Sequence, residues 1–176
     1  MVRCSLKIMT KHPCCIIFRV RNEITKEHFM EIEIKYLVKK LPEGLSGMEC
    51  HHIEQAYIST EPVIRIRRED DLCYLTCKGK GMLEREECNI PMSPESYERL
   101  LKKTEGIIIV KDRYLVPLGD GHTAELDIFH GRHEGLIIVE IEFESRAEAE
   151  AYTVPDWFGE DVTYNASYKN STLSKG

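Results

Sequence analysis

Residues 30–38, Met-Glu-Ile-Glu-Ile-Lys-Tyr-Leu-Val, are the stretch that decides the fold. Charged and apolar residues alternate here with a period of two, so Glu31, Glu33 and Lys35 share one face of a strand and apolar side chains share the other. The pattern recurs along the chain in pairs of like charge: Arg65 and Arg67, Lys78 and Lys80, Glu125 and Asp127, and Glu140 and Glu142. These charged faces indicate either an open sheet with one solvated face or a closed sheet with its charges inside.

The like-charge pairs favour the closed sheet. Like charges gain nothing by lying side by side on a solvated face. Inside a tunnel, converging carboxylates are suitable ligands for Mg²⁺ or Mn²⁺. Arg and Lys side chains opposite them bind phosphate oxygens. We therefore predict an α+β protein, mainly β, with an eight-stranded antiparallel closed tunnel and a few peripheral helices.

Turn residues divide the chain into eight predicted strands. Their approximate ranges are 30–39, 49–60, 62–69, 72–79, 83–91, 107–117, 122–130 and 135–144. The links between them have hairpin length, which implies antiparallel pairing. Two helices are predicted, one from Ser93 to Gly106 and one from the capping box at Ser145 to about Tyr152.

Composition excludes several classes of protein. The formal net charge of -6 argues against sequence-independent nucleic-acid binding. Seven cysteines without a C-x-x-C pair indicate neither a disulfide framework nor a zinc knuckle. No stretch reaches the roughly 20 apolar residues of a membrane span. We expect a cytoplasmic protein with reduced thiols, a monomer or homodimer, that binds neither membranes nor nucleic acid.

Residues 1–29 have clustered cysteines and basic residues but no clear period. We interpret them as an N-terminal appendage and residues 30–176 as the tunnel domain. One hypothesis is that Met30 is the biological start and that the preceding residues come from an over-extended reading frame. The alternative is an ordinary extra strand or arm.

Segments distributed in order along residues 31–170 resemble the CYTH-domain family, the triphosphate tunnel metalloenzymes. The segments are E-x-E-x-K at 31–35, Q-A-Y at 55–57, R-I-R at 65–67, L-T-C-K-G at 75–79, R-E-E at 85–87, K-D-R-Y at 111–114, E-L-D-I-F-H-G at 125–131, V-E-I-E-F at 139–143, P-D-W-F-G at 155–159 and Y-K-N at 168–170. The short length and the 155–159 segment are most similar to compact bacterial inorganic triphosphatases.

The resemblance implies metal-dependent hydrolysis of the terminal phosphoanhydride of a triphosphate. Inorganic tripolyphosphate is the substrate that it favours most. The implied metal-site carboxylates are Glu31, Glu33, Glu140 and Glu142, with Glu125 and Asp127 completing or orienting that shell. The implied phosphate-binding residues are Arg65, Arg67, Lys78, Lys80, Arg85, Lys111, Arg113 and Lys169. Lys35 and Tyr57 resemble a dyad proposed to activate the attacking water, and direct phosphate binding by Lys35 is the alternative. Glu87 is expected in the lumen.

Other functions stay open at this point. The same tunnel can hydrolyse thiamine triphosphate or nucleoside triphosphates, or cyclise ATP as in the class IV adenylyl cyclases. A non-catalytic polyphosphate-binding or metal-binding module is the alternative from a different class. Asn89 departs from the family pattern, because relatives usually carry a second acid there. Lys80 lies in a Gly-Lys-Gly turn from which its side chain can also point outward.

Overall fold

The structure is a computed structural model that describes residues 29–176, and of Phe29, Met30, Glu84 and Arg85 it describes the backbone alone. The strands are β1 (Phe29–Val38), β2 (Glu49–Thr60), β3 (Val63–Glu69), β4 (Leu72–Lys78), β5 (Glu84–Met92), β6 (Glu105–Pro117), β7 (Thr123–His130), β8 (Ile137–Glu142) and β9 (Phe158–Asp161). The helices are α1 (Pro94–Leu101), α2 (Arg146–Ala151) and α3 (Asn170–Leu173), with short 3-10 turns η1 (Leu45–Gly47), η2 (Gly131–His133) and η3 (Ala166–Tyr168). Apart from Phe29, the predicted appendage lies outside the described residues.

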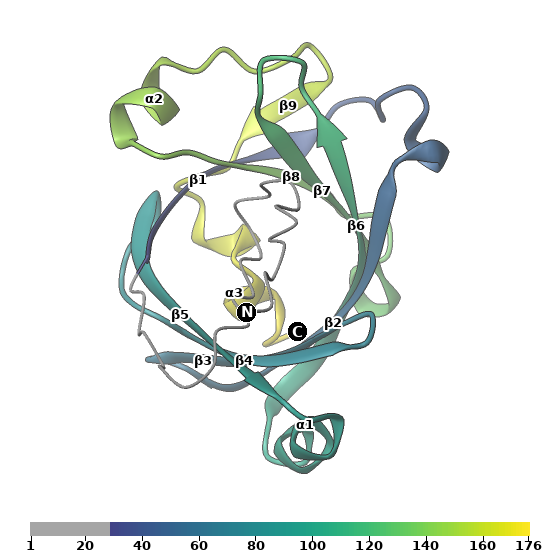
Figure 1. Cartoon of the computed structure of the whole chain (residues 1–176), viewed down its shortest axis with the longest axis vertical. Coiled ribbons are helices and arrows are strands. Elements are labelled where there is room, and N and C mark those ends of the chain that lie inside the picture. Colours follow the sequence, from purple (N-terminus) through teal and green to yellow (C-terminus); the bar gives the residue numbers. More distant parts are fainter. Residues whose placement is uncertain (1–28) are drawn as a thin grey trace, which may run out of the picture.

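Eight antiparallel strands form a ring in the order β5-β4-β3-β2-β6-β7-β8-β1 (Figure 1). Strand β1 completes the ring because it pairs with both β5 and β8. Its first residues, Phe29 to Ile32, pair with β5, and Glu33 to Leu37 pair with β8. The predicted antiparallel tunnel is therefore confirmed.

Strand β9 is an addition to the eight predicted strands. On one edge of β1, β5 covers only Phe29 to Ile32. The rest of that edge is available, and β9 pairs there, with Asp161 opposite Tyr36 and Phe158 opposite Val38. Staggered strands in a closed sheet leave such unpaired ends at the rim.

Helix α1 lies outside the ring (Figure 1) and packs on an apolar cluster of its wall. The Ser93 hydroxyl caps the helix by accepting from the Ser96 amide. Tyr97 is fully buried and packs with Ile66 and Cys73, and burying such a side chain contributes about 2 kcal/mol. The helix is shorter than predicted because β6 already begins at Glu105.

The cysteines of β4 lie in different environments. Cys73 packs under α1, whereas Cys77 on the same face of β4 is exposed.

The C-terminal segment is attached to the start of β6. The Ile107 amide donates to the Ser174 carbonyl over 2.7 Å. Gly106 has a φ of +74°, and a Cβ at this position would lie 2.1 Å from the Ser174 oxygen, so only glycine allows this approach. Leu173 packs against the cluster that includes Tyr57. This attachment brings the residues before α3 to one end of the tunnel.

No helix of the described residues is long and apolar enough to span a membrane.

Candidate active site

The tunnel contains a cavity of about 610 Å³, a volume that includes its solvent-open part. The lining is mostly charged: Glu31, Glu33, Lys35, Tyr57, Val63, Arg65, Arg67, Lys78, Glu87, Arg113, Glu125, Glu140, Glu142, Lys169, Asn170 and Ser171. The structure therefore brings most of the predicted site residues around one space.

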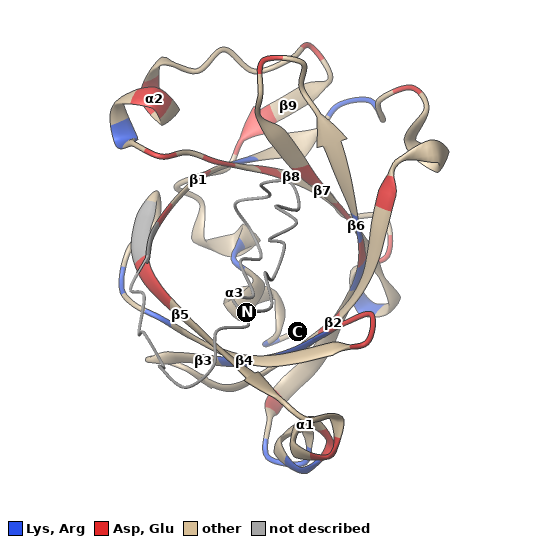
Figure 2. Ribbon diagram, viewed as in Figure 1, with Lys and Arg blue, Asp and Glu red and all other residues tan. Residues whose placement is uncertain are grey.

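The two signs of charge occupy different parts of the ring. We call the carboxylates of β1, β7 and β8 the acidic arc: Glu31, Glu33, Glu125, Glu140 and Glu142. We call the cations of β3 and β4 the basic arc: Arg65, Arg67 and Lys78. In Figure 2 the acidic positions follow β8 and the basic positions follow β3, on opposite sides of the ring. The two arcs meet where β4 and β5 approach β1.

The acidic arc is crowded with negative charge. Burial, together with the carboxylates of Glu125, Glu31 and Glu33, raises the pKa of Glu142 to about 8. Burial also opposes ionisation of Glu140, but Lys35, Arg113 and Lys111 outweigh it and hold the pKa of Glu140 well below its usual range. Lys35 Nζ lies 2.6 Å from Glu140 Oε1, and Arg113 Nη2 donates to Glu140 Oε2 over 3.0 Å. One carboxyl thus ionises readily and its neighbour holds a proton at neutral pH.

In the basic arc, most hydrogen-bond partners of the arginines are uncharged groups. Arg65 donates to the Thr76 hydroxyl over 3.1 Å, and Arg67 donates to the Gln55 amide oxygen and the Tyr74 hydroxyl, each over 3.0 Å. Within the described residues, the buried Nε atoms of both arginines have no hydrogen-bond partner. Buried donors without partners are uncommon and costly, so these two point to an absent anion.

Lys78 is the exception in the basic arc, because it bridges to the acidic side. Its Nζ lies 2.7 Å from Glu31 Oε1 and 2.5 Å from Glu87 Oε2. Burial opposes ionisation of Glu87, but Lys78 and Arg65 outweigh it and lower the pKa of Glu87. Glu87, the expected lumen residue, therefore lines the cavity as a paired carboxylate.

Lys111 and Asp127 lie on the inward faces of β6 and β7, two residues along the strand from the lining residues Arg113 and Glu125. Lys111 is 0% exposed and donates to Asp127. Asp127 also accepts from Arg113 Nε over 2.7 Å. Neither Lys111 nor Asp127 is among the residues that line the cavity. Their contacts hold Arg113 in place against Glu125 and Glu140.

Lys80 and Arg85 are two further predicted phosphate-binding residues, and Lys80 is not among the residues that line the cavity. Lys80 is exposed in the turn after β4. Arg85 belongs to β5, where its backbone pairs with Glu31, but its side chain lies outside the part of the chain that the structure describes.

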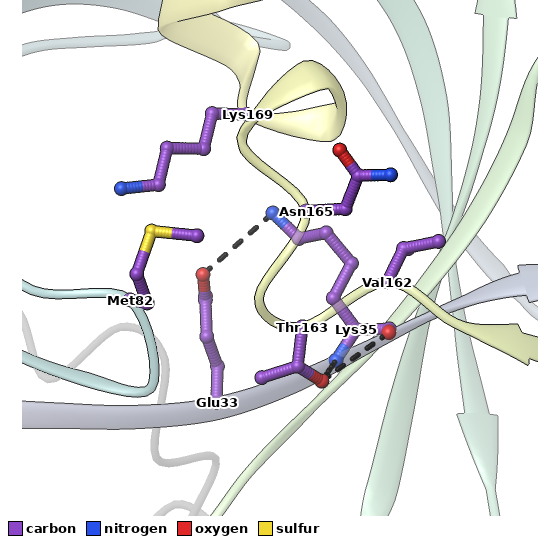
Figure 3. A pocket seen from close by; sticks show the side chains of 7 residues that line it. All are labelled: Glu33, Lys35, Met82, Val162, Thr163, Asn165 and Lys169. Carbon is purple, nitrogen blue, oxygen red and sulfur yellow. Dashed lines mark hydrogen bonds and ion pairs between the residues drawn. The ribbon is translucent and has the colours of Figure 1, made fainter.

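A smaller pocket adjoins Lys35 at the end of the tunnel (Figure 3). Glu33 lies 3.7 Å from Lys35 Nζ, and the backbone amide of Lys35 donates to the Thr163 hydroxyl over 2.9 Å. Lys169 extends into this region and donates to the Gly81 carbonyl over 3.0 Å. The segment before α3 thus contacts the β4–β5 turn across the tunnel end.

A model of the CYTH domain family matches residues 30–175. The chain belongs to the CYTH family. The resemblance inferred from the ordered sequence segments is therefore confirmed.

Two relatives and a solved structure are similar to this chain over most of its length. An inorganic triphosphatase of Nitrosomonas europaea is 38% identical over 149 residues, which cover 82% of this chain and 96% of that protein. An inorganic triphosphatase of Acetivibrio thermocellus is 37% identical over 153 residues, covering 82% of this chain and 93% of that protein. A crystal structure of an inorganic triphosphatase superposes with a TM-score of 0.64 at 35% identity, covering 83% of this chain and 95% of that one.

The acidic arc of this CYTH chain has donors that fit a hard divalent cation. Carboxylate oxygens are the ligands that Mg²⁺ and Mn²⁺ prefer, and burial together with three neighbouring carboxylates raises the pKa of Glu142 to about 8. Among residues 29–176, no three His, Cys, Asp or Glu side chains are already grouped to hold a metal ion. Glu31 and Glu140 are instead directed toward Lys78 and Lys35. A cation would therefore replace ammonium groups as the partner of these carboxylates.

Sequence reasoning missed several polar residues of the CYTH site. Asn170 and Ser171 line the cavity from α3, and Gln55 and Thr76 accept hydrogen bonds from the arginines. Gln55, Thr76 and Asn170 stood within the Q-A-Y, L-T-C-K-G and Y-K-N segments, which were usable signals, whereas Ser171 had none. Asn89 accepts from the Thr76 hydroxyl over 2.6 Å and donates to Glu87, so it joins the same network.

Proposed function

We propose that this chain hydrolyses the terminal phosphoanhydride of a triphosphate, with inorganic tripolyphosphate as its main substrate and Mg²⁺ or Mn²⁺ as its cofactor. The observation that carries the proposal is the division of one cavity wall into an acidic and a basic arc, each with incomplete charge compensation. The identity to inorganic triphosphatases over most of the chain supports this substrate class.

The basic arc is suited to a linear polyphosphate. Guanidinium groups bind phosphate oxygens through paired N–H donors, and Arg65 and Arg67 lie on one strand with buried donors still to be satisfied. Lys78 adds a charge on the next strand, and Lys169 adds one at the tunnel end. We assign these residues, with Arg113 and Lys35, to phosphate binding.

The acidic arc would hold the metal. Glu31, Glu33, Glu140 and Glu142 are the proposed ligands, with Glu125 beside them. When bound, the cation would neutralise charge that develops on the phosphate oxygens. Asp127 has a different role in our proposal, because its contacts with Lys111 and Arg113 make it a support for the wall.

Tyr57 acts in this proposal as a hydrogen-bond donor. Burial raises its pKa, although Arg65, Arg67 and Lys35 act in the opposite direction. The hydroxyl therefore keeps its proton at neutral pH and can donate to the bound substrate or to the attacking water. Lys35, which lines the same cavity, would contact the phosphate chain beside it.

Phosphate release is the direct test. Purified protein is assayed with tripolyphosphate, thiamine triphosphate and ATP, each with Mg²⁺, with Mn²⁺ and with a chelator. We expect pyrophosphate and phosphate in equal amounts from tripolyphosphate, the highest kcat/KM for that substrate, and no release with chelator. Preference for a nucleotide or thiamine compound would overturn the substrate, cyclic AMP from ATP would favour a cyclase, and binding without turnover would favour a non-catalytic module.

The setting of the reaction belongs to the same proposal. The net charge of -6 and the enclosed charged cavity suit a small anionic substrate better than nucleic acid. We propose that the protein acts in the cytoplasm as a monomer or homodimer. Light scattering coupled to size-exclusion chromatography would measure the oligomeric state.

A further inference from the structure

Gln55 is a polar side chain buried in the middle of the tunnel wall. It lies on β2, is 0% exposed and is not part of the cavity lining. Its two hydrogen-bonded neighbours, Arg67 and Tyr57, both line the cavity. A buried amide has to satisfy its donors and acceptor inside the protein, so its partners restrict how it is oriented.

The orientation of the Gln55 amide follows from the chemistry of Arg67. Arg67 Nη2 donates to Gln55 Oε1 over 3.0 Å. A guanidinium has donors only, so the amide oxygen has to face Arg67 and the NH₂ group has to face the other way. Gln55 Nε2 then donates to the Tyr57 hydroxyl oxygen over 3.3 Å.

This contact determines how Tyr57 can use its hydroxyl. Because the oxygen already accepts from Gln55, the hydroxyl proton points toward a different partner. Tyr57 lines the cavity and keeps its proton at neutral pH, since burial raises its pKa. The available direction for its O–H is therefore the cavity.

We propose that Gln55 is a positioning residue of the active site, which holds Arg67 with its amide oxygen and directs the Tyr57 hydroxyl toward an oxygen of the bound triphosphate with its amide N–H. The inference rests on the proposed triphosphatase function. One amide thus couples a phosphate-binding group on β3 to a hydrogen-bond donor on β2. The register agrees with this arrangement, because Gln55 pairs directly with Arg67 across the two strands.

The variant Gln55→Glu separates the two contacts. A carboxylate still accepts from Arg67, but it accepts from the Tyr57 hydroxyl as well, which turns the proton away from the cavity. We expect kcat to fall about tenfold, the scale of one lost hydrogen bond to a charged group, while KM changes by less than about threefold. Thermal unfolding shows whether the variant is folded.

A double-mutant cycle with Tyr57→Phe shows whether Gln55 affects kcat through the Tyr57 hydroxyl. If Gln55 acts through the tyrosine hydroxyl, Gln55→Glu lowers kcat in the wild-type background and has little further effect in the Tyr57→Phe background. Equal losses in both backgrounds, or an unchanged kcat, would overturn the role of Gln55. If Gln55→Glu fails to fold, the same cycle is measured with Gln55→Met. KM should then rise as well, because Arg67 also loses its acceptor.

The failures of the two proposals can be distinguished. A wild-type protein that releases no phosphate from any of the triphosphates would overturn the proposed function and this inference together. Wild-type turnover with additive losses in the cycle would overturn only the positioning role.

Discussion

The acidic and basic arcs of the tunnel wall differ in the partners that their charged side chains have. In the acidic arc, burial together with the neighbouring carboxylates raises the pKa of Glu142 to about 8. In the basic arc, Arg65 and Arg67 are held by hydroxyl and amide groups, and their Nε donors are buried without a partner among the described residues. The acidic arc thus lacks positive charge, and the basic arc lacks hydrogen-bond acceptors.

This difference teaches how one cavity can receive a cation and a polyanion together. The hydrogen-bond partners of Arg65 and Arg67 are mostly neutral, with Glu69 at 3.8 Å from Arg67, whereas the ammonium groups of Lys35 and Lys78 pair with carboxylates of the acidic arc. Buried uncompensated charge reduces stability and is typical of functional sites. Ligands that supply the missing charge are expected to stabilise the protein.

The largest expected effect comes from the acidic arc. Glu140→Gln removes the carboxylate that ion-pairs with both Lys35 and Arg113, and we expect kcat with tripolyphosphate to fall at least about 100-fold, since it removes charge from the proposed metal site. Steady-state phosphate release measures the loss. Glu144→Gln, an exposed acid just after the same strand, is the matched control. Near-normal turnover in both Glu140→Gln and Glu33→Gln would show that the acidic arc does not hold the metal.

A smaller effect is expected from the basic arc. Arg67→Ala should raise KM about tenfold or more with a lesser change in kcat, because its main loss is phosphate binding. Initial rates over a range of tripolyphosphate concentrations separate the two constants. Lys103→Ala on the outer surface is the control for net charge.

Lys80→Ala in the same assay tests the turn residue. Its exposure predicts a change in KM below about twofold. A rise comparable to that of Arg67→Ala would mean that the turn folds over the bound substrate.

The protonation of Glu142 predicts a pH-dependent stability. Its pKa of about 8 in the folded protein exceeds the ordinary 4.5. The folded state therefore retains a proton that the unfolded chain has released, and this group makes the metal-free protein less stable as pH rises from about 4.5 to about 8. Glu142→Gln should raise Tm by several degrees at pH 9 and change it little at pH 5.

Scanning fluorimetry in the presence of a chelator measures these values. Added Mg²⁺ should reduce the difference at pH 9, because the cation compensates the same charge. An equal change in Tm at both pH values would contradict a raised pKa for Glu142.

The smallest effect is expected from the region preceding both arcs. We propose that residues 1–29 form an appendage to the tunnel domain, 30–176. A chain that begins at Met30 should fold and hydrolyse tripolyphosphate within about twofold of the full-length rate, because every proposed site residue follows that position. Thermal unfolding and phosphate release compare the two chains. Insolubility or inactivity of the shorter chain would move the domain boundary.

Much of the fold followed from local sequence patterns. Period-two alternation identified which side chains share a face, and turn residues separated eight strands whose positions agree with the structure to within a few residues. Strand β9 was missed because four residues, Phe-Gly-Glu-Asp, are too short for alternation to be visible. Its pairing depends on the edge of β1 that β5 leaves open, which no local pattern records.

The sequence by itself determined the family, the closed antiparallel sheet and the shared face of the paired charges within each strand, because strand periodicity assigns each residue to a face. Only the tertiary structure decided how deep each residue lies and what it touches. It left Lys80 exposed, kept Lys111 and Asp127 out of the cavity lining, raised the pKa of Glu142 and set Gln55 between Arg67 and Tyr57. The physical reason is that burial, ionisation and hydrogen bonding depend on neighbours across strands, and these neighbours are distant in the chain until the tunnel closes.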